Sequence, residues 1–342
     1  MTDGGLLQTK ASLLVVEDDP AMLVALRDIL EGAGYDVATA PNGKAALDVM
    51  AVQRPTLILS DISMPIMDGI ELFESVRKLP GSATIPFIFL TARGTREDIF
   101  AAKSLGADDY ITKPITSQEL LAAVRARLQR TDEMMLAQLK AAYKASLLTL
   151  ANAIESRDQY TRRHVERVNA YAQAVGQALG WGQSQLEALE FSAILHDIGK
   201  ISIREAILCK TGPLNPDEWQ EMRQHPRVGA RMIAGIPYLS PAVPAIISHH
   251  ERWDGSGYPD GLKGETIPSE ARLLAVVDTF DAMTSDRPYH RAMDSTAAFN
   301  EITSRAGMQF DPAMVEAFRT CWTRGVIQNI TASYETLHES MR

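Results

Sequence analysis

The sequence predicts two domains of different fold class: a doubly wound α/β domain with a five-stranded parallel sheet, followed by an all-α helical bundle. Three observations support this prediction. In the first 130 residues, short apolar runs alternate with amphipathic stretches. Beyond residue 143, apolar residues recur with helical periodicity. The length of 342 residues also favours two hydrophobic cores over one.

The composition is that of an ordinary globular protein, with 46% hydrophobic and 23% charged residues. A net charge of -9 argues against a general nucleic-acid binder, so we expect no DNA partner. We expect no membrane insertion, because no run of about 18 apolar residues occurs and the N-terminus does not resemble a signal peptide. Two isolated cysteines, Cys209 and Cys321, are predicted to be reduced thiols in a cytoplasmic protein.

The first domain is predicted to span residues 11–128, after a tail of residues 1–10. Alternating strands and helices imply a parallel sheet that is covered on both faces. The predicted strands are residues 12–16, 35–39, 57–60, 86–90 and 108–111. The predicted helices are residues 20–35, 43–53, 67–79, 96–105 and 117–128.

Polar residues follow the predicted strands where ligands of parallel sheets bind, at the carboxyl ends. Clustered carboxylates without histidine or cysteine suit a hard cation such as magnesium. A carboxylate beside that ion can act as a nucleophile toward a phosphoryl group. A single aspartate at a strand end is more often a helix cap, so the argument depends on the whole set. The set is Glu17, Asp18, Asp19, Asp61, Thr91 and Lys113.

Together with Met64-Pro65 and Lys113-Pro114, this set resembles the response-regulator receiver domain, whose fold is flavodoxin-like. The resemblance implies that a cognate histidine kinase phosphorylates Asp61. It also implies that the peptide bond between Lys113 and Pro114 is cis. The implied residues are the phosphoacceptor Asp61, the magnesium ligands Glu17, Asp18 and Asp61, and the switch residues Thr91, Tyr110 and Lys113.

The helical pattern that begins at residue 117 continues to residue 150 without a glycine or proline. Apolar residues recur in steps of three and four, as in a heptad repeat. One interpretation is a single helix that packs onto its own domains. The other, which we favour, is a coiled coil over the connecting helix 129–150 that makes a homodimer.

The second domain, residues 151–342, is predicted to be all-α. Its helices, counted from the end of the connector, are predicted at residues 143–157, 162–179, 186–195, 216–224, 225–236, 241–250, 269–283, 296–305 and 312–323, with a frayed helix at 331–342. A glycine-rich loop at residues 251–268 is long enough to indicate a functional role.

Six of the seven histidines lie between residues 164 and 290. Imidazole and carboxylate together suit iron, manganese or zinc. Neighbouring residues on a helix point about 100° apart, so His196 and Asp197 cannot chelate one ion, but Asp197 can bridge two. An isolated His-Asp pair is more often a surface feature or a core histidine. The pair His249-His250 and the downstream Asp278 favour the metal interpretation.

Four motifs resemble the HD-GYP family of metal-dependent phosphodiesterases and occur in that family's order. They are His196-Asp-Ile-Gly-Lys200, His249-His-Glu251, Asp254-Gly-Ser-Gly-Tyr-Pro259 and Asp278-Thr-Phe-Asp-Ala-Met-Thr-Ser-Asp-Arg-Pro-Tyr289. The resemblance implies a response regulator that hydrolyses cyclic di-GMP to pGpG, and in some members on to GMP, with a hydroxide that two metal ions activate. The two ions are expected to be divalent transition metals, iron first, with manganese or others as alternatives.

The resemblance also implies the metal ligands. Asp197 is expected to bridge the two ions and to act in catalysis. Tyr160 stands where some family members carry a glutamate for a third metal, and Glu155 does not match that position, so we predict two metals. One ion is assigned His164, His196 and Asp278, and the other His225, His249 and His250.

Lys200 follows His196 by four residues, so we expect it on the same helical face, where it stabilises phosphoryl charge. An ordinary solvated lysine is the alternative. The implied substrate contacts are Lys200, Arg287, Gly257 and Tyr258, and the loop around Tyr258 is also the implied contact for GGDEF-type protein partners. Two other functions stay open: a non-catalytic effector that binds cyclic di-GMP or a protein, and an HD phosphohydrolase acting on another nucleotide.

Overall fold

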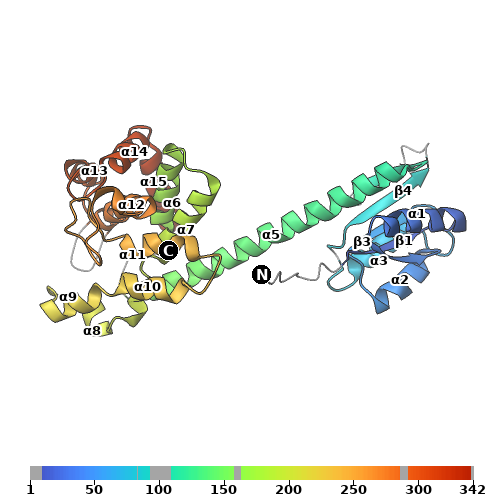
Figure 1. Cartoon of the computed structure of the whole chain (residues 1–342), viewed down its shortest axis with the longest axis horizontal. Helices are drawn as coiled ribbons and strands as arrows, with labels where there is room; N and C mark the ends of the chain where they lie inside the picture. Colours follow the sequence, from blue (N-terminus) through green and yellow to red (C-terminus); the bar gives the residue numbers. More distant parts are fainter. Residues whose placement is uncertain (1–9, 83, 93–108, 158–162, 286–291, 340–342) are drawn as a thin grey trace, which may run out of the picture. The chain divides into compact units, whose positions relative to one another are not determined.

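A computed structural model describes residues 10–82, 84–92, 109–157, 163–285 and 292–339. The chain divides into two units, residues 1–140 and 141–342. Helix α5 (Ser117–Glu155) begins in the first unit and ends in the second (Figure 1).

The first unit contains the predicted five-stranded sheet. All neighbouring strands are parallel, in the order β2-β1-β3-β4-β5, which is the doubly wound arrangement. Each observed strand boundary lies within two residues of its prediction. The strands are β1 (Ser12–Val16), β2 (Asp36–Ala40), β3 (Leu57–Asp61), β4 (Phe87–Ala92) and β5 (Asp109–Lys113).

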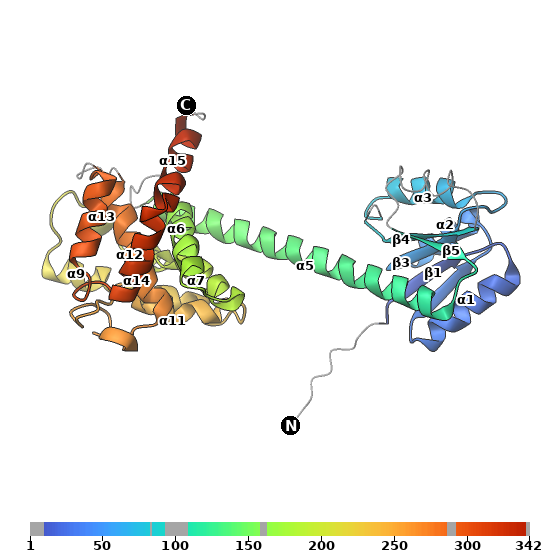
Figure 2. The same cartoon turned by 90° about the horizontal axis from the view of Figure 1, so that it is seen from above.

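Helices cover both faces of this sheet. Helix α1 (Pro20–Gly32) and the start of α5 pack on one face through Leu26, Leu30, Leu120 and Val124. Helices α2 (Gly43–Val52) and α3 (Gly69–Lys78) pack on the other face (Figure 2). The helix predicted at residues 96–105 lies outside the described residues.

The predicted connector is part of one helix, because α5 continues for 39 residues. Its middle exposes large apolar side chains to solvent: Met135 is 70% exposed and Leu139 is 66% exposed. Near its end, Leu147 and Ala151 are buried in a core of the second unit. The helix therefore has packed ends and an apolar, exposed middle.

The described part of the second unit is helical, as predicted. Its main core joins α6, α12 and α14 through Tyr171, Phe280 and Phe318. The helices are α6 (His164–Ala178), α7 (Gln183–Leu195), α8 (Glu205–Leu208), α9 (Pro216–Met222), α10 (His225–Ile233), α11 (Val243–Ser248), α12 (Ser269–Thr284), α13 (Ser295–Ser304), α14 (Pro312–Thr323) and α15 (Val326–Glu339). In the described part of this unit, 3-10 helices also occur: η1 (Ile198–Ser202), η2 (Ser240–Ala242) and η3 (Gly264–Thr266).

The structure departs most clearly from the predicted helices at the following places. The four-residue helix α8 is too short to leave a periodic pattern and was not predicted. The segment predicted as one helix at 241–250 is a 3-10 turn followed by α11, which ends before His249. The last helix begins at Val326 rather than at residue 331. Among the described residues, no helix combines the length and apolar character that a bilayer span needs.

Candidate functional site

The structure brings the seven predicted metal ligands together in two groups within the second unit. Within each group, one ligand atom per residue lies within 4.8 Å of the others. The first group is His164, His196 and Asp278, and the second is Asp197, His225, His249 and His250.

Six of these seven ligands stand at or just beyond helix ends. His164 begins α6 and His225 begins α10. His196 and Asp197 lie at the junction of α7 with η1, His249 and His250 follow α11, and Asp278 lies on α12.

Asp197 stands between the two groups. Its Oδ2 lies 3.3 Å from Nε2 of His196, and its Oδ1 lies 3.1 Å from Nε2 of His225. The side chain is buried, so water does not screen these contacts. Burial opposes ionisation of Asp197, but the charges of Lys200 and His196 outweigh it and hold the pKa of the carboxyl well below its usual range.

Backbone carbonyls orient three of the imidazoles in the same way. In each ring Nδ1 lies within hydrogen-bond distance of the carbonyl oxygen three residues earlier, which leaves Nε2 for the centre of the site. The pairs are His196 with Ala193 at 2.9 Å, His225 with Met222 at 2.8 Å, and His249 with Ile246 at 2.7 Å.

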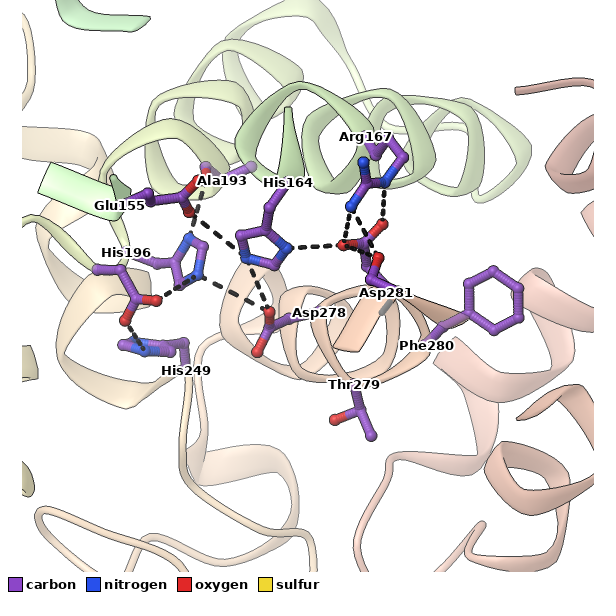
Figure 3. Close-up of polar contacts among 12 residues, drawn as sticks. Glu155, His164, Arg167, Ala193, His196, His249, Asp278, Thr279, Phe280 and Asp281 are labelled. Carbon is purple, nitrogen blue, oxygen red and sulfur yellow. Dashed lines mark hydrogen bonds and ion pairs between the residues drawn. The ribbon is translucent and has the colours of Figure 1, made fainter. Parts of the chain in front are cut away.

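The fourth imidazole, His164, is oriented by a carboxylate. Its Nδ1 lies 2.7 Å from Oδ2 of Asp281, and Nε of Arg167 donates to Oδ1 of Asp281 at 2.6 Å (Figure 3). Burial alone would lower the pKa of His164, but Asp281 outweighs it and raises that pKa. Sequence reasoning missed this role of Asp281. The available signal was its position one helical turn after Asp278, inside the same motif.

Changing Asp281 to asparagine is expected to weaken metal binding by about 10- to 100-fold, because the amide supports the orientation and basicity of His164 less well than the carboxylate. Equilibrium titration with manganese measures this change. Ser285→Ala is the matched control, since Ser285 contacts the same carboxylate without touching the ring. Equal metal affinity in Asp281→Asn and the unchanged protein would refute the positioning role.

Glu155 is a further member of the cluster that sequence reasoning set aside. It is 6% exposed at the end of α5, and its Oε1 lies 3.7 Å from Nε2 of His164. Glu155, His164 and Asp197 form a third group whose ligand atoms lie close enough together to hold a metal ion. Burial raises the pKa of Glu155 to about 7 against the opposing charges of His164 and His196. Tyr160, on which the prediction of two metals was based, lies outside the described residues.

Lys200 lies at the site, although for a different reason than predicted. We expected α7 to continue past His196, but at Asp197 the backbone leaves the α conformation, with φ -100° and ψ 5°, and η1 begins. The tighter 3-10 spacing brings Nζ of Lys200 to 2.9 Å from Oδ2 of Asp197. Lys200 is buried, so the alternative of a solvated lysine is wrong.

Gly199 allows the two halves of the site to approach each other. A Cβ at this position would lie 1.9 Å from the carbonyl oxygen of His225 and 2.6 Å from the backbone nitrogen of Gly229. Any side chain would therefore separate η1 from α10. The glycine in His196-Asp-Ile-Gly-Lys200 thus keeps Asp197 close to His225.

The loop after His250 is held by Glu251, whose buried carboxylate accepts hydrogen bonds from the backbone nitrogens of Asp260 at 2.7 Å and Leu262 at 3.1 Å. A Cβ on Gly257 would lie 2.4 Å from the backbone nitrogen of Arg252, so only glycine fits there. The ring of Tyr258 stacks on His250 with centroids 4.8 Å apart. Arg287, the other predicted substrate contact, lies outside the described residues.

The cluster fits divalent transition-metal ions. Nε2 of His225 and Nε2 of His249 face each other at 3.4 Å, although both Nδ1 atoms are directed to carbonyls. Two ring lone pairs at this distance repel unless a proton or cation lies between them. Nε2 of His196 and Oδ1 of Asp197 are buried and make no well-formed hydrogen bond among the described residues. The cluster therefore has three features of a metal site: imidazole and carboxylate ligands, ligand atoms that converge, and buried polar atoms without a well-formed hydrogen bond.

A second cluster lies at the carboxyl edge of the sheet in the first unit. Glu17, Asp18 and Asp61 place carboxylate oxygens within 4.8 Å of one another. Nζ of Lys113 donates to Oε2 of Glu17 and to Oδ2 of Asp61, both at 2.7 Å. Burial raises the pKa of Glu17, although Lys113 opposes this shift. These residues fit a magnesium ion beside a carboxylate nucleophile.

The remaining predicted receiver residues lie on the two neighbouring strands. Thr91 is buried on β4, its backbone paired with Thr112 of β5, and Tyr110 packs beside the α2–α3 core. The peptide bond between Lys113 and Pro114 is cis, as expected. Asp19, which follows the acidic pair, instead caps α1 by accepting from the backbone nitrogens of Ala21 and Met22.

Two family models match the chain. The model of the response regulator receiver domain matches residues 13–125, and the model of an HD domain matches residues 149–314. The two matches correspond to the sheet domain and to the helical unit. The helical unit holds the seven predicted metal ligands, which we call the metal-type cluster. An HD domain implies a divalent metal, and a receiver domain implies a phosphodonor such as a histidine kinase.

Curated relatives match the chain, some of them along nearly its whole length. The cyclic di-GMP phosphodiesterase response regulator RpfG of Xanthomonas campestris is 36% identical over 90% of this chain and 86% of that protein. A cyclic di-GMP phosphodiesterase of Thermotoga maritima is 34% identical over 90% of this chain and 89% of that protein. A 3'3'-cGAMP-specific phosphodiesterase of Vibrio cholerae is 33% identical over 55% of this chain and 36% of that protein. The chain therefore belongs to the family of the cyclic di-GMP phosphodiesterase response regulators, and its HD domain is that of a phosphodiesterase.

Proposed function

We propose that this protein hydrolyses cyclic di-GMP to pGpG under the control of phosphorylation at Asp61. The observation that carries the catalytic part is the position of Asp197, whose two oxygens face different groups of histidines. A carboxylate in this position would be able to hold two metal ions at once, and a metal pair would supply the chemistry that hydrolysis of a phosphodiester needs. The names of the two full-length relatives support the choice of substrate.

Two divalent ions, of which iron is our first choice and manganese the second, would supply an activated water and polarise the phosphoryl oxygens. His164, His196 and Asp278 would hold one ion, His225, His249 and His250 the other, and Asp197 both. Lys200 has a buried ammonium 2.9 Å from Asp197, so it can stabilise negative charge that develops on the phosphate. The missing side chain of Gly257 lets the Tyr258 loop pack directly against the backbone of His250 and Arg252, which fixes Tyr258 beside the cluster.

One observation favours a second candidate function, hydrolysis of a different cyclic dinucleotide. About half of the chain, 55%, resembles a phosphodiesterase whose name specifies 3'3'-cGAMP. Metal ions recognise the phosphate, so the bases must be selected by residues around the cluster. A non-catalytic effector is disfavoured, because a domain that only binds has no need of Lys200 beside a full set of metal ligands.

The test is a product assay on anaerobically purified protein with iron or manganese and a measured metal content. Cyclic di-GMP and 3'3'-cGAMP are supplied separately, and products are followed by chromatography. We expect conversion of cyclic di-GMP to pGpG at the higher kcat/KM. Faster turnover of 3'3'-cGAMP would establish the second candidate, and no turnover of either by metal-loaded protein would establish the effector.

For the receiver domain, we propose that Glu17, Asp18 and Asp61 hold magnesium while a cognate histidine kinase phosphorylates Asp61. Lys113 lies 2.7 Å from Asp61 and would contact the phosphoryl group, while Thr91 and Tyr110 would respond to it. Reduced thiols at Cys209 and Cys321 fit the cytoplasmic location that this pathway requires. GGDEF-type proteins remain proposed partners of the Tyr258 loop.

Asp61→Asn is expected to abolish uptake of a labelled phosphoryl group, because the amide is not a nucleophile. Incubation with magnesium and a radiolabelled small-molecule phosphodonor, followed by gel autoradiography, measures the uptake. Asp28→Asn, at an exposed position of α1, is the matched control and should label normally. Undiminished labelling of Asp61→Asn would refute the phosphoacceptor assignment.

We also propose that the exposed apolar middle of α5 pairs with α5 of a second copy. Changing Met135 and Leu139 together to glutamate should convert a dimer to a monomer, because charges would then face each other in an apolar seam. Sedimentation velocity of the full chain measures the change. Val52→Glu, at a 91% exposed position of α2, is the control. A protein that is monomeric before any substitution, with and without a phosphoryl mimic, would remove the dimer.

A further inference from the structure

A pocket lies between α9, α10 and the Tyr258 loop, and we call it the α9–α10 pocket. Its volume is about 690 Å³. This size is within the range of small-molecule sites in proteins, roughly 300–1,000 Å³. The side chains that matter here are Trp219, Gln220, Arg223, Arg227 and Tyr258. Of these five side chains, only Tyr258 has a role predicted from the sequence.

The pocket adjoins the metal-type cluster through the ring of Tyr258. Tyr258 stacks on His250, which belongs to the second ligand group, with an angle of 30° between the rings. The guanidinium of Arg223 lies 5.4 Å from the centroid of the same tyrosine ring. A substrate whose phosphodiester lies at the cluster can therefore extend into this pocket.

Arg223 carries a charge that the described residues do not neutralise. It makes no ion pair among them, whereas its neighbour Arg227 pairs with Asp260. Its guanidinium lies 5.6 Å from the ring centroid of Trp219, and the side chain of Trp219 is 44% exposed. The pocket thus presents a cationic hydrogen-bond fork between two aromatic rings, one of which is partly exposed to solvent.

These features match a purine base better than a phosphate alone. Aromatic faces stack on nucleobases, which a phosphate cannot do. A guanidinium fork donates to O6 and N7 of guanine, whereas adenine replaces O6 with an amino donor that the fork cannot bond. The amide of Gln220 adds a donor and an acceptor at the same rim.

We propose that the α9–α10 pocket binds one guanine nucleotide half of the substrate, with Arg223 bonded to the guanine edge and Trp219 stacked on the base. This inference rests on the proposed function, because it assigns the selection between cyclic dinucleotides to this pocket. It adds Trp219 and Arg223 to the residues that determine specificity.

The test compares kinetics of the full-length, metal-loaded protein on cyclic di-GMP and cyclic di-AMP. Arg223→Ala should raise KM for cyclic di-GMP by about tenfold or more and lower the preference for guanine by a similar factor, since one bidentate base contact is lost. Trp219→Ala should also raise KM, and Trp219→Phe should restore it by keeping an aromatic face. Arg231→Ala, an exposed arginine of α10, is the matched control.

A binding measurement separates this inference from the proposed function. Cyclic di-GMP should quench the tryptophan fluorescence of the protein, and Trp219→Phe should remove that quenching while the three other tryptophans remain. If the unchanged protein binds but does not hydrolyse cyclic di-GMP, the proposed function fails and the pocket stands. KM, base preference and quenching that are the same in Arg223→Ala and Trp219→Ala as in the unchanged protein would overturn the pocket assignment.

Discussion

Replacing Asp197 by alanine is expected to abolish both bound metal and turnover. Its two oxygens lie 3.3 Å from His196 and 3.1 Å from His225, so one substitution removes a ligand from both groups. It also removes the carboxylate that lies 2.9 Å from the buried ammonium of Lys200. We expect kcat/KM to fall by more than about 100-fold, which exceeds the usual cost of losing a residue that only orients a ligand.

Metal content by mass spectrometry and product formation by chromatography measure the two effects. Asp197→Asn is the informative second variant, because it keeps the side-chain volume but removes the charge that two cations would share. Glu316→Gln, an exposed carboxylate of α14, is the control and should behave as the unchanged protein. Full metal content or normal turnover in Asp197→Ala would contradict the bridging role.

Gly199→Ala is expected to disable the site without touching a ligand. The Cβ of the new alanine would lie 1.9 Å from the backbone oxygen of His225. This distance is a severe steric clash, so η1 and α10 must separate. Overpacking of this kind costs about 1–3 kcal/mol of stability and occasionally more. The separation also moves His225 away from Asp197, so metal content and turnover should fall together.

Thermal unfolding, metal content and activity measured on one preparation test this prediction. Gly235→Ala, just beyond α10, is the control, because nothing lies within 4 Å of its added methyl group. Phosphoryl uptake by the receiver domain reports whether the rest of the chain has folded. Unchanged metal content in Gly199→Ala would show that η1 and α10 need not be in contact.

The fold was predictable from the sequence because its signals are local. The buried strand β1 was predicted at its observed bounds, since a continuous apolar run is bounded by polar residues. The prediction of one helix at residues 241–250 was wrong in its boundaries. Pro241 and Pro244 are compatible with both a 3-10 turn and the start of an α-helix, so tertiary packing decides between them. Helix α8 has four residues and no periodicity to read.

The candidate site was predictable only as a set of residue types. Six of the seven predicted ligands stand at helix ends and Asp278 lies within α12, so their convergence depends on how these helices pack. The sequence could not show that Asp281 and Arg167 orient His164, because this contact joins positions 117 and 114 residues apart. Glu155 was missed for a similar reason, since its distance from His164 depends on how the end of α5 packs. The contact of Gly199 with α10 is also purely tertiary.

Anomalous diffraction from crystals of the iron- or manganese-loaded protein tests the central claim most directly. We predict two anomalous peaks, one on each side of the Asp197 carboxylate, with His196 beside one and His225 beside the other. A single peak, or peaks that do not contact Asp197, would contradict this account.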